Sequence, residues 1–283
     1  MGDAPKWAQP EIQKAMKNYP FIQDIPAAEY HAAAARGEFL SSHNLALFRA
    51  CPAAYRLKME GAEIQPETPA LLVGRAVHAL TLEGRSAFDA EFLVSDGPRN
   101  PKTGEPFGRL TKAYQEWAAA QDRAVVSTKD FGWMVAMQRA VWLHGAAAEL
   151  LGSGFAEGTI RVRLHDEPCQ TRMDWFNPDA GIVDLKTCDT IDFFESDARR
   201  YGYVHQLSFY REAFREVSGK TVEAHLVAVE KHEPYRVGVW TILPASLDEA
   251  EEQNAAAIAE LHECRRTDTW PTRFEAPRIL ALH

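Results

Sequence analysis

Cysteine is scarce in this 283-residue sequence, which has only Cys51, Cys169, Cys188 and Cys264 and no C-x-x-C pair. Zinc ribbons and iron–sulfur clusters are usually held by closely spaced thiolates, so this spacing argues against both cofactors. A chain of this length also buries enough apolar surface to fold without disulfides. We therefore expect buried free thiols, no zinc and no iron–sulfur cluster.

Long apolar runs are also missing from the sequence. None approaches the roughly 20 residues that a helix needs to span a bilayer. The first ten residues, MGDAPKWAQP, show no basic segment followed by an apolar one, which a secretory signal would require. We expect a cytoplasmic protein with no membrane partner.

Basic residues are outnumbered, with 31 Lys and Arg against 40 Asp and Glu, for a formal net charge of −9. This balance excludes a surface that attracts polyanions over the whole molecule. It leaves open a nucleic-acid enzyme, because a local basic groove or bound metal ions can offset an acidic exterior.

The hydrophobic pattern changes from helical spacing to alternation near residue 155. Helical spacing covers SSHNLALFRACPAAYRLKM, TPALLVGRAVHALTLEG and residues 110–151, with a cap at Ser41 or Ser42, a break at Pro52 and an end at Gly84. Strands are predicted in GTIRVRLHD, QTRMDWF, GIVDLKT, EAHLVAVEK and YRVGVWTIL, and helices in YVHQLSFYREAFREV and residues 247–266.

These elements predict an α/β fold, in which a mixed central sheet is flanked by helices and preceded by a helical N-terminal half. We expect one domain over residues 1–283. Its parts are an arm over 1–40, a helical part over 41–151, an α/β core over 155–245, and a helix and tail over 246–283.

The stretch DWFNPDAGIVDLKT, residues 174–187, places two carboxylates and a lysine inside a predicted hairpin. Asp184 and Lys186 are two residues apart and share a strand face, which Asp174 can approach from the neighbouring strand. Oxygen ligands of this kind hold Mg²⁺, and a bound metal activates water and offsets charge on phosphorus. Spacing alone leaves a second interpretation open, a salt-bridged hairpin on a solvated sheet face.

The order Asp174, then Asp184-Leu185-Lys186, resembles the D…(D/E)-x-K signature of the PD-(D/E)xK nuclease superfamily. Two further motifs resemble its RecB-like branch. HQLSFYREAF resembles the Q-x-x-x-Y helix, and VGRAVHALTLEG resembles the upstream G-x-x-x-H element. Over residues 28–272 the layout is similar to the nuclease domain of RecE, a functional relative of phage lambda exonuclease. The missing cysteine pair favours this branch over the one that carries an iron–sulfur cluster.

The resemblance implies a PD-(D/E)xK fold and a set of site residues. The catalytic residues would be Asp174, Asp184, Lys186, Gln206 and Tyr210, and the metal ligands His78, Asp174, Asp184, the Leu185 carbonyl and Glu157. DNA contacts are expected at Ser41, His43 and Arg49, which lie where relatives contact DNA. Alternation along GTIRVRLHD adds Arg161 and Arg163, which share a strand face with Thr159 and would form a basic strip. Glu83 is left out, because its five-residue offset from His78 turns it off that face of an α-helix.

Each of these residues also has an ordinary explanation. A histidine on an apolar helix is commonly a core or surface residue, and Gln206 and Tyr210 could be an ordinary polar pair one turn apart. A glutamate that opens a strand, such as Glu157, is often solvated. Capping and solvation explain Ser41, His43 and Arg49 as well as DNA contact does.

The function that the resemblance implies is Mg²⁺-dependent digestion of double-stranded DNA from its ends, 5′ to 3′, leaving 3′ single strands for recombination by annealing. Mn²⁺ is expected to replace Mg²⁺. The resemblance also implies a bacterial or phage protein, a ring-shaped homo-oligomer (trimer or tetramer) and a single-strand annealing partner of the RecT or Bet type. The alternatives are a PD-(D/E)xK endonuclease and an inactive DNA-binding scaffold, although an intact Asp/Asp/Lys set argues against the latter.

Overall fold

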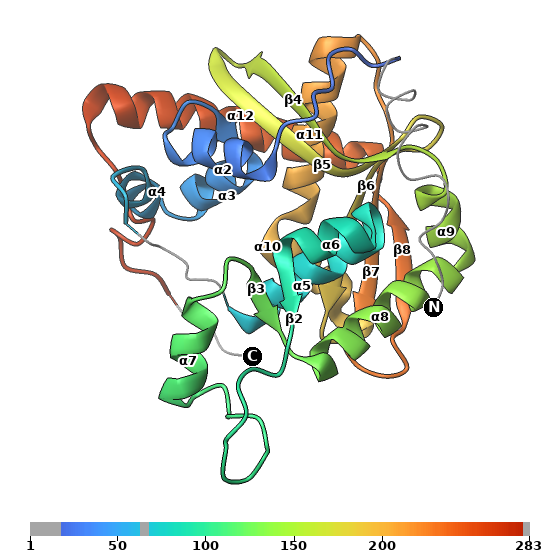
Figure 1. Ribbon diagram of the computed structural model, residues 1–283. Helices are drawn as coiled ribbons and strands as arrows, with labels where there is room; N and C mark the ends of the chain where they lie inside the picture. Colours follow the sequence, from blue (N-terminus) through green and yellow to red (C-terminus); the bar gives the residue numbers. More distant parts are fainter. Residues whose placement is uncertain (1–17, 63–67, 280–283) are drawn as a thin grey trace.

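A six-stranded mixed sheet forms the centre of the computed structural model, which describes residues 18–62 and 68–279 (Figure 1). Residues 1–17 of the expected arm and 280–283 of the expected tail lie outside the described residues. The strands are β1 (Leu40–Ser41), β4 (Phe155–Leu164), β5 (Glu167–Asn177), β6 (Gly181–Cys188), β7 (Ala224–Glu230) and β8 (Val237–Thr241). The predicted α/β class with a mixed sheet is confirmed.

The sheet divides at strand β5, where two different strands pair with one edge, and we call this division the fork. Along one edge β5 pairs antiparallel with β4 over nearly its whole length. Because that edge is occupied, β1 and β6 must share the other edge, where β1 pairs parallel at residues 169–170 and β6 antiparallel at 175–177. The segment between these two pairings, residues 171–174, has no strand partner on this edge. The fork therefore leaves the backbone of residues 171–174 without a strand partner next to β6, where Asp174 is half-buried.

Helices cover both faces of the sheet, each over its own apolar cluster. On one face α11 (Tyr203–Ser218) packs against β4, β5 and β6, and α12 (Pro244–Thr267) packs on α11. On the other face α5 (Pro69–His78) and α8 (Thr128–Leu143) pack against β6 and β7. Side chains alternate along β6 as predicted, since Ile182 belongs to the first cluster and Val183 and Leu185 to the second.

The N-terminal helices α2 (Ala27–Ala35), α3 (Ser42–Ala50) and α4 (Pro52–Met59) lie together at one side of the molecule, while α5, α6 (Arg85–Glu91) and α8 lie at another (Figure 1). Ser41 caps α3 by accepting a hydrogen bond from the backbone N–H of Asn44, and Pro52 begins α4 as expected for a break. Cys51 caps α4 and is half-buried, whereas the other three cysteines are buried free thiols.

Two local features differ from the expected helical half. Residues 110–151 hold α7 (Lys112–Ala119), β3 (Ala124–Val126), α8 and α9 (Gly145–Leu151), and β3 pairs parallel with β2 (Phe92–Val94). Strands of three residues are too short to show an alternating pattern, so the sequence did not reveal this small sheet. The second feature is a π-helical turn, η1 (Ala79–Glu83), which continues α5.

The remaining elements join β6 to α11. A 3₁₀ turn, η2 (Ile191–Phe193), leads into α10 (Phe194–Tyr201), and Gly202 in the left-handed region separates α10 from α11. Within the described residues, no helix is both long and apolar enough to cross a membrane.

Candidate active site

Asp174 and Asp184 meet where β5 and β6 separate. The last pair between these strands is Trp175 with Val183, each of which is next to one of the two aspartates in the chain. Asp174 Oδ2 accepts a hydrogen bond from the backbone N–H of Leu185 at 3.0 Å, so the carboxylate takes the place of a strand partner. Asp184 is only 1% exposed. The predicted approach of the two carboxylates is thus explained by the fork.

Lys186 and the helix motif surround Asp184. Lys186 Nζ lies 2.5 Å from Asp184 Oδ2, and its charge also faces the ring of Tyr203 at 4.9 Å. From α11, Gln206 donates through Nε2 to Asp184 Oδ1 at 3.0 Å, and the hydroxyl of Tyr210 lies 3.0 Å from the same amide. Helical spacing therefore places both motif residues over the carboxylate, rather than leaving them as an unrelated polar pair.

His78 and Glu157 approach Asp174 from two other elements. His78 Nε2 lies 3.4 Å from Asp174 Oδ2 and 3.3 Å from Glu157 Oε1. Glu157 has φ of 61°, a left-handed conformation that is unusual for a glutamate within a strand and is often found at functional sites. A Cβ on Gly74 would lie 3.5 Å from Thr187 Oγ1, so α5 packs closely on β6 and directs His78 to this cluster.

Glu83 belongs to this cluster, so its exclusion from the sequence-based set was wrong. The exclusion assumed α-helical geometry, in which a five-residue offset changes the helix face. The residues after His78 instead form a π turn, closed by a hydrogen bond from Gly84 N–H to the Ala79 carbonyl at 2.9 Å. In a π-helix residues i and i+5 are neighbours. Glu83 Oε1 accordingly lies 3.9 Å from His78 Nδ1.

Burial and charge shift the pKa values of these groups in opposite directions. Burial raises the pKa of Asp184 to about 7, the charge of Asp174 adds to this rise, and Lys186 opposes it. Burial also acts on Asp174, but His78 and Lys186 outweigh it and hold the Asp174 pKa below its usual value. Burial alone would lower the pKa of His78, yet Asp174 raises it above the usual range. Without a cation, the site therefore tends to keep protons at neutral pH.

The donor atoms fit a hard divalent cation. His78, Glu83 and Glu157 each offer one donor atom within 4.8 Å of the others. Asp184 Oδ2 is buried without a well-oriented hydrogen bond, although Lys186 is close. Carboxylate oxygens suit Mg²⁺ and Mn²⁺, and a bound cation would displace the protons that the site retains. His78, Asp174 and Glu157 could hold such a cation, with Asp184 beside them.

The residues expected to contact DNA lie in different surroundings. Ser41 is only 4% exposed and caps α3, which fits the capping alternative better than DNA contact. His43 is exposed on the surface of α3, yet the surrounding protein and the Lys186 charge lower the pKa of its ring to about 4, so the ring lies near the catalytic cluster. The Arg49 guanidinium is half-buried, 2.6 Å from His205 Nε2.

Arg161 and Arg163 share a face of β4, as predicted, but do not form a free basic strip. The Arg161 guanidinium contacts Glu29 at 3.4 Å and lies over the ring of Phe39. Arg163 is exposed and donates to the Asp166 carbonyl. Thr159 on the same face is fully buried. Any DNA contact on this strand would thus rely mainly on Arg163.

Three residues next to the cluster were not singled out as site residues from the sequence. The Ser42 hydroxyl lies 3.4 Å from that of Tyr210, and Tyr203 faces Lys186. Arg172 forms an ion pair with Glu157. Strand alternation offered a signal for Arg172, which lies two residues before Asp174. Ser42 and Tyr203 carried none, since both reach the cluster only through packing of α3 and α11.

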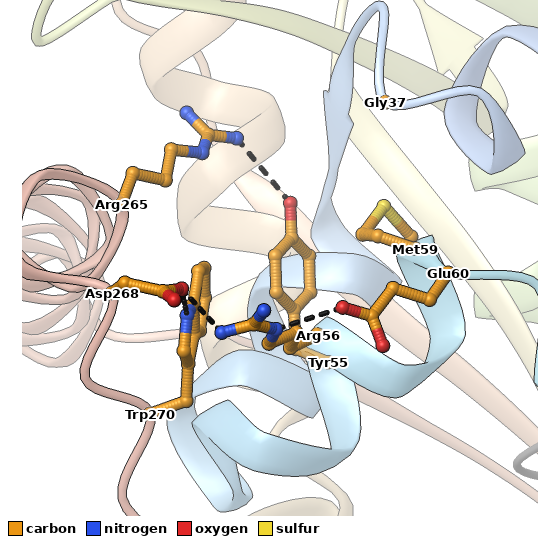
Figure 2. A pocket seen from close by; sticks show the side chains of 8 residues that line it. All are labelled: Gly37, Tyr55, Arg56, Met59, Glu60, Arg265, Asp268 and Trp270. Carbon is orange, nitrogen blue, oxygen red and sulfur yellow. Dashed lines mark hydrogen bonds and ion pairs between the residues drawn. The ribbon is translucent and has the colours of Figure 1, made fainter.

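A pocket near the C-terminal end of α12 is separate from this cluster. Figure 2 shows this pocket, with a volume of about 340 Å³, and its lining residues Gly37, Tyr55, Arg56, Met59, Glu60, Arg265, Asp268 and Trp270. Arg56 is paired with both Glu60 and Asp268, and Arg265 contacts the Tyr55 hydroxyl. The pocket contains none of the predicted site residues, and its Arg56 charge is already neutralised.

Comparison with known proteins places the chain in a family. A family model described as a PDDEXK-like domain of unknown function (DUF3799) matches residues 41–280, so the chain belongs to that family. The resemblance to PD-(D/E)xK nucleases is thereby confirmed. No curated protein matches the sequence.

One of the similar solved structures shares this fold over nearly the whole chain. A candidate exonuclease from Eubacterium rectale is similar over 92% of this chain and 96% of its own, with a TM-score of 0.65 and 17% identity. A phage-related exonuclease from Haemophilus somnus 129PT matches 62% of this chain and 95% of its own, with a TM-score of 0.34 and 15% identity. The first likeness supports the PD-(D/E)xK fold described above.

Proposed function

We propose that this protein is a divalent-metal-dependent nuclease that hydrolyses phosphodiester bonds of DNA. The observation that carries this proposal is that Asp174 and Glu157 both approach His78 Nε2, at 3.4 and 3.3 Å, with the Asp184–Lys186 pair beside them. The chain belongs to a PDDEXK-like family, Asp174, Asp184 and Lys186 resemble the motif in that description, and the fork in the sheet brings Asp174 and Asp184 together. A purely structural salt-bridge network would not require Asp184 Oδ2 to be buried without a well-oriented hydrogen bond.

Each side chain has a distinct task in this reaction. A bound Mg²⁺ or Mn²⁺ would supply Lewis acidity toward a phosphate oxygen and a water molecule. Asp174, Asp184, Glu157 and His78 hold negative charge and donor atoms at the fork, where the reacting phosphate would lie. Lys186 stays protonated, because the charges of Asp184 and Asp174 outweigh burial and raise its pKa. Its ammonium orients the attacking water and stabilises charge that builds up on the phosphate.

Gln206 and Tyr210 act on Asp184 rather than on phosphate. Gln206 occupies Asp184 Oδ1, which leaves Oδ2 directed toward Lys186 and the cation position. Tyr210 holds the Gln206 amide in place, and burial raises its pKa well above the usual value, so its hydroxyl remains protonated. This chain of contacts keeps α11 aligned with β6.

The finer proposal follows the RecE resemblance. We propose that the enzyme digests duplex DNA from its ends, 5′ to 3′, with Mg²⁺ as the natural ion and Mn²⁺ as a substitute. A ring-shaped homo-oligomer would enclose the duplex, and a single-strand annealing protein of the RecT or Bet type would receive the 3′ strand. The product would serve homologous recombination in a bacterium or phage.

The test is incubation of purified protein with linear duplex labelled at one 5′ or one 3′ end. Mg²⁺ and Mn²⁺ should support release of mononucleotides from the 5′ end, whereas Ca²⁺, with its looser coordination, should allow binding with little cleavage. Nicking of closed circular plasmid would favour the endonuclease alternative. Undiminished cleavage in excess EDTA would overturn the metal-dependent mechanism, and DNA binding without cleavage would favour the inactive scaffold.

A further inference from the structure

The two ring nitrogens of His78 face different carboxylates. Nε2 points to Asp174 and Glu157, at 3.4 and 3.3 Å, whereas Nδ1 points to Glu83 at 3.9 Å. The exposed fraction of the side chain is 20% for His78 and 27% for Glu83, so the imidazole is held on both sides within a largely enclosed site. This arrangement depends on the π turn that brings Glu83 back to the His78 face.

A histidine binds a metal through a nitrogen that carries no proton, so the proton of the neutral ring must be on the other nitrogen. A partner for that second nitrogen selects the tautomer, orients the ring and makes the ligand nitrogen more basic. Carboxylates commonly provide this partner. In this chain Glu83 is the carboxylate on the Nδ1 side.

We propose that Glu83 is a positioning residue that keeps the proton of His78 on Nδ1 and thereby makes Nε2 the metal-binding atom. The inference rests on the nuclease function proposed above and adds a residue to its metal site. It also assigns a purpose to the π turn: an α-helical continuation would place Glu83 on another face, and His78 would lose its carboxylate partner. The separation of 3.9 Å is longer than a hydrogen bond, so the carboxylate would act on the Nδ1 proton by charge, and a cation on Nε2 would strengthen this attraction by polarising the ring.

The geometry favours this role for Glu83 over direct metal binding. Nε2 already lies beside two carboxylates from the strands, which provide a compact donor group on that side. Glu83 approaches His78 through Nδ1, at 3.9 Å, and is thus farther from the imidazole than the two strand carboxylates are from Nε2.

Metal binding is measured by titrating metal-free protein with Mn²⁺ and recording free Mn²⁺ by electron paramagnetic resonance, with no DNA present. Wild-type protein should bind Mn²⁺, and Asp174→Asn should abolish or nearly abolish binding at the site. Glu83→Ala should weaken binding about 10- to 100-fold, the usual effect of losing such a partner. Glu83→Gln keeps an acceptor without the charge and should weaken binding less. Glu116→Ala, on an exposed helical glutamate, is the control and should leave binding unchanged.

The proton on His78 provides a second measurement that a merely structural role would not change. In ¹⁵N-labelled protein saturated with Mg²⁺, the His78 ring should show a slowly exchanging Nδ1–H, assigned by its loss in His78→Gln. Glu83→Ala should speed exchange of this proton with solvent even at saturating Mg²⁺.

Four results separate the possibilities. Absence of Mn²⁺ binding by wild-type protein would refute the nuclease proposal itself. Equal affinity of Glu83→Ala and wild-type protein would refute the role of Glu83 alone. If Glu83→Ala loses Mn²⁺ binding as completely as Asp174→Asn, Glu83 binds the metal directly and the positioning role is overturned. A proton found on Nε2 of His78 in the Mg²⁺-saturated protein would also overturn the positioning role.

Discussion

Lys186 carries the positive charge that the proposed reaction uses next to Asp184. It is the ammonium that lies against Asp184, at 2.5 Å, and its side chain is 18% exposed. Lys186→Ala should lower single-turnover cleavage of end-labelled duplex by about 10² to 10³-fold or more, because one charge-stabilising group is commonly worth about 3–4 kcal/mol. Asp174→Asn and Asp184→Asn should reduce cleavage at least as much.

Circular dichroism should show that these variants keep the fold. Lys112→Ala is the matched control, since Lys112 is a helical lysine that is 86% exposed, and it should cleave normally. Near-normal cleavage by Lys186→Ala would mean that this hairpin is not the catalytic centre.

Asp184 predicts a pH dependence of stability in metal-free protein. Its pKa is about 7 in the folded protein and about 3.9 in an unfolded chain. Between these values the folded state binds the proton more tightly, so the stability from Asp184 is present below pH 4 and lost as pH rises through 7. Asp184→Asn has no such titration. The variant should therefore become more stable relative to wild type as pH rises from 5 to 8.

The measurement is thermal unfolding in EDTA at several pH values, with the difference in Tm between Asp184→Asn and wild type plotted against pH. A rise equivalent to at least about 1 kcal/mol, or roughly 2–4 °C, is expected. Added Mn²⁺ should stabilise wild-type protein much more than the variant. If the difference in Tm in EDTA does not change with pH, Asp184 is not protonated near neutral pH in the folded protein.

At the scale of elements, the π turn η1 depends on the glycine that ends it. Gly84 has φ of 91° and ψ of −178°, a conformation almost restricted to glycine, and its N–H closes the turn onto Ala79. A Cβ would meet no atom within 4 Å, so the cost of a side chain is conformational rather than steric. Gly84→Ala should cost about 1–3 kcal/mol of folding free energy and weaken Mn²⁺ binding.

Gly108→Ala is the control for this change. A Cβ there also meets no atom within 4 Å, and Gly108 is not in the positive-φ region. Its effect on denaturant unfolding should be within about 0.5 kcal/mol of wild type. Equal stability of the two variants would show that the turn tolerates an ordinary backbone and does not constrain Glu83.

Elements also differ in how well the sequence foretold them. Long periodic segments such as α11 and α12, and the strands β5 to β7, lie where predicted, because each buries one face over many residues. The π turn and the pair β2–β3 were missed, because one extra residue in a helix or three residues in a strand leave almost no periodic signal.

For the whole molecule, the proposed function requires an acidic protein to hold a polyanion. The net charge is −9, and the predicted strip on β4 is reduced by the contact of Arg161 with Glu29. A single copy should therefore bind DNA weakly, and a ring that encloses the duplex would supply processivity without a large basic surface. Light scattering should give a trimer or tetramer, and digestion should continue after trapping with excess competitor DNA.

Arg163→Ala tests the local contact within this scheme, since Arg163 is the exposed arginine of the strip. It should weaken DNA binding modestly and lower the salt dependence of the binding constant by about one ion. Lys112→Ala should leave that dependence unchanged. A monomer that digests long duplexes without dissociating would contradict the ring, and a monomer that leaves after each cut would favour the endonuclease.

The sequence by itself determined the fold class and much of the active site. Alternation put Asp184 and Lys186 on one strand face, helical spacing put Gln206 and Tyr210 on one helix face, and the hairpin turn set Asp174 opposite. These relations are local, because they depend only on the geometry of a strand, a helix or a turn. The candidate catalytic pair, Asp184 and Lys186, can therefore be predicted from the sequence without knowledge of the fold.

Only the tertiary structure decided which distant groups complete the site. The fork at β5 exposes Asp174, close packing of α5 on β6 delivers His78, and the π turn returns Glu83 to the same cluster. It also showed that Ser41 is buried as a helix cap and that Arg161 is already paired. Such outcomes depend on how elements far apart in the chain pack together, and on a one-residue change in helical pitch, neither of which a periodic pattern records.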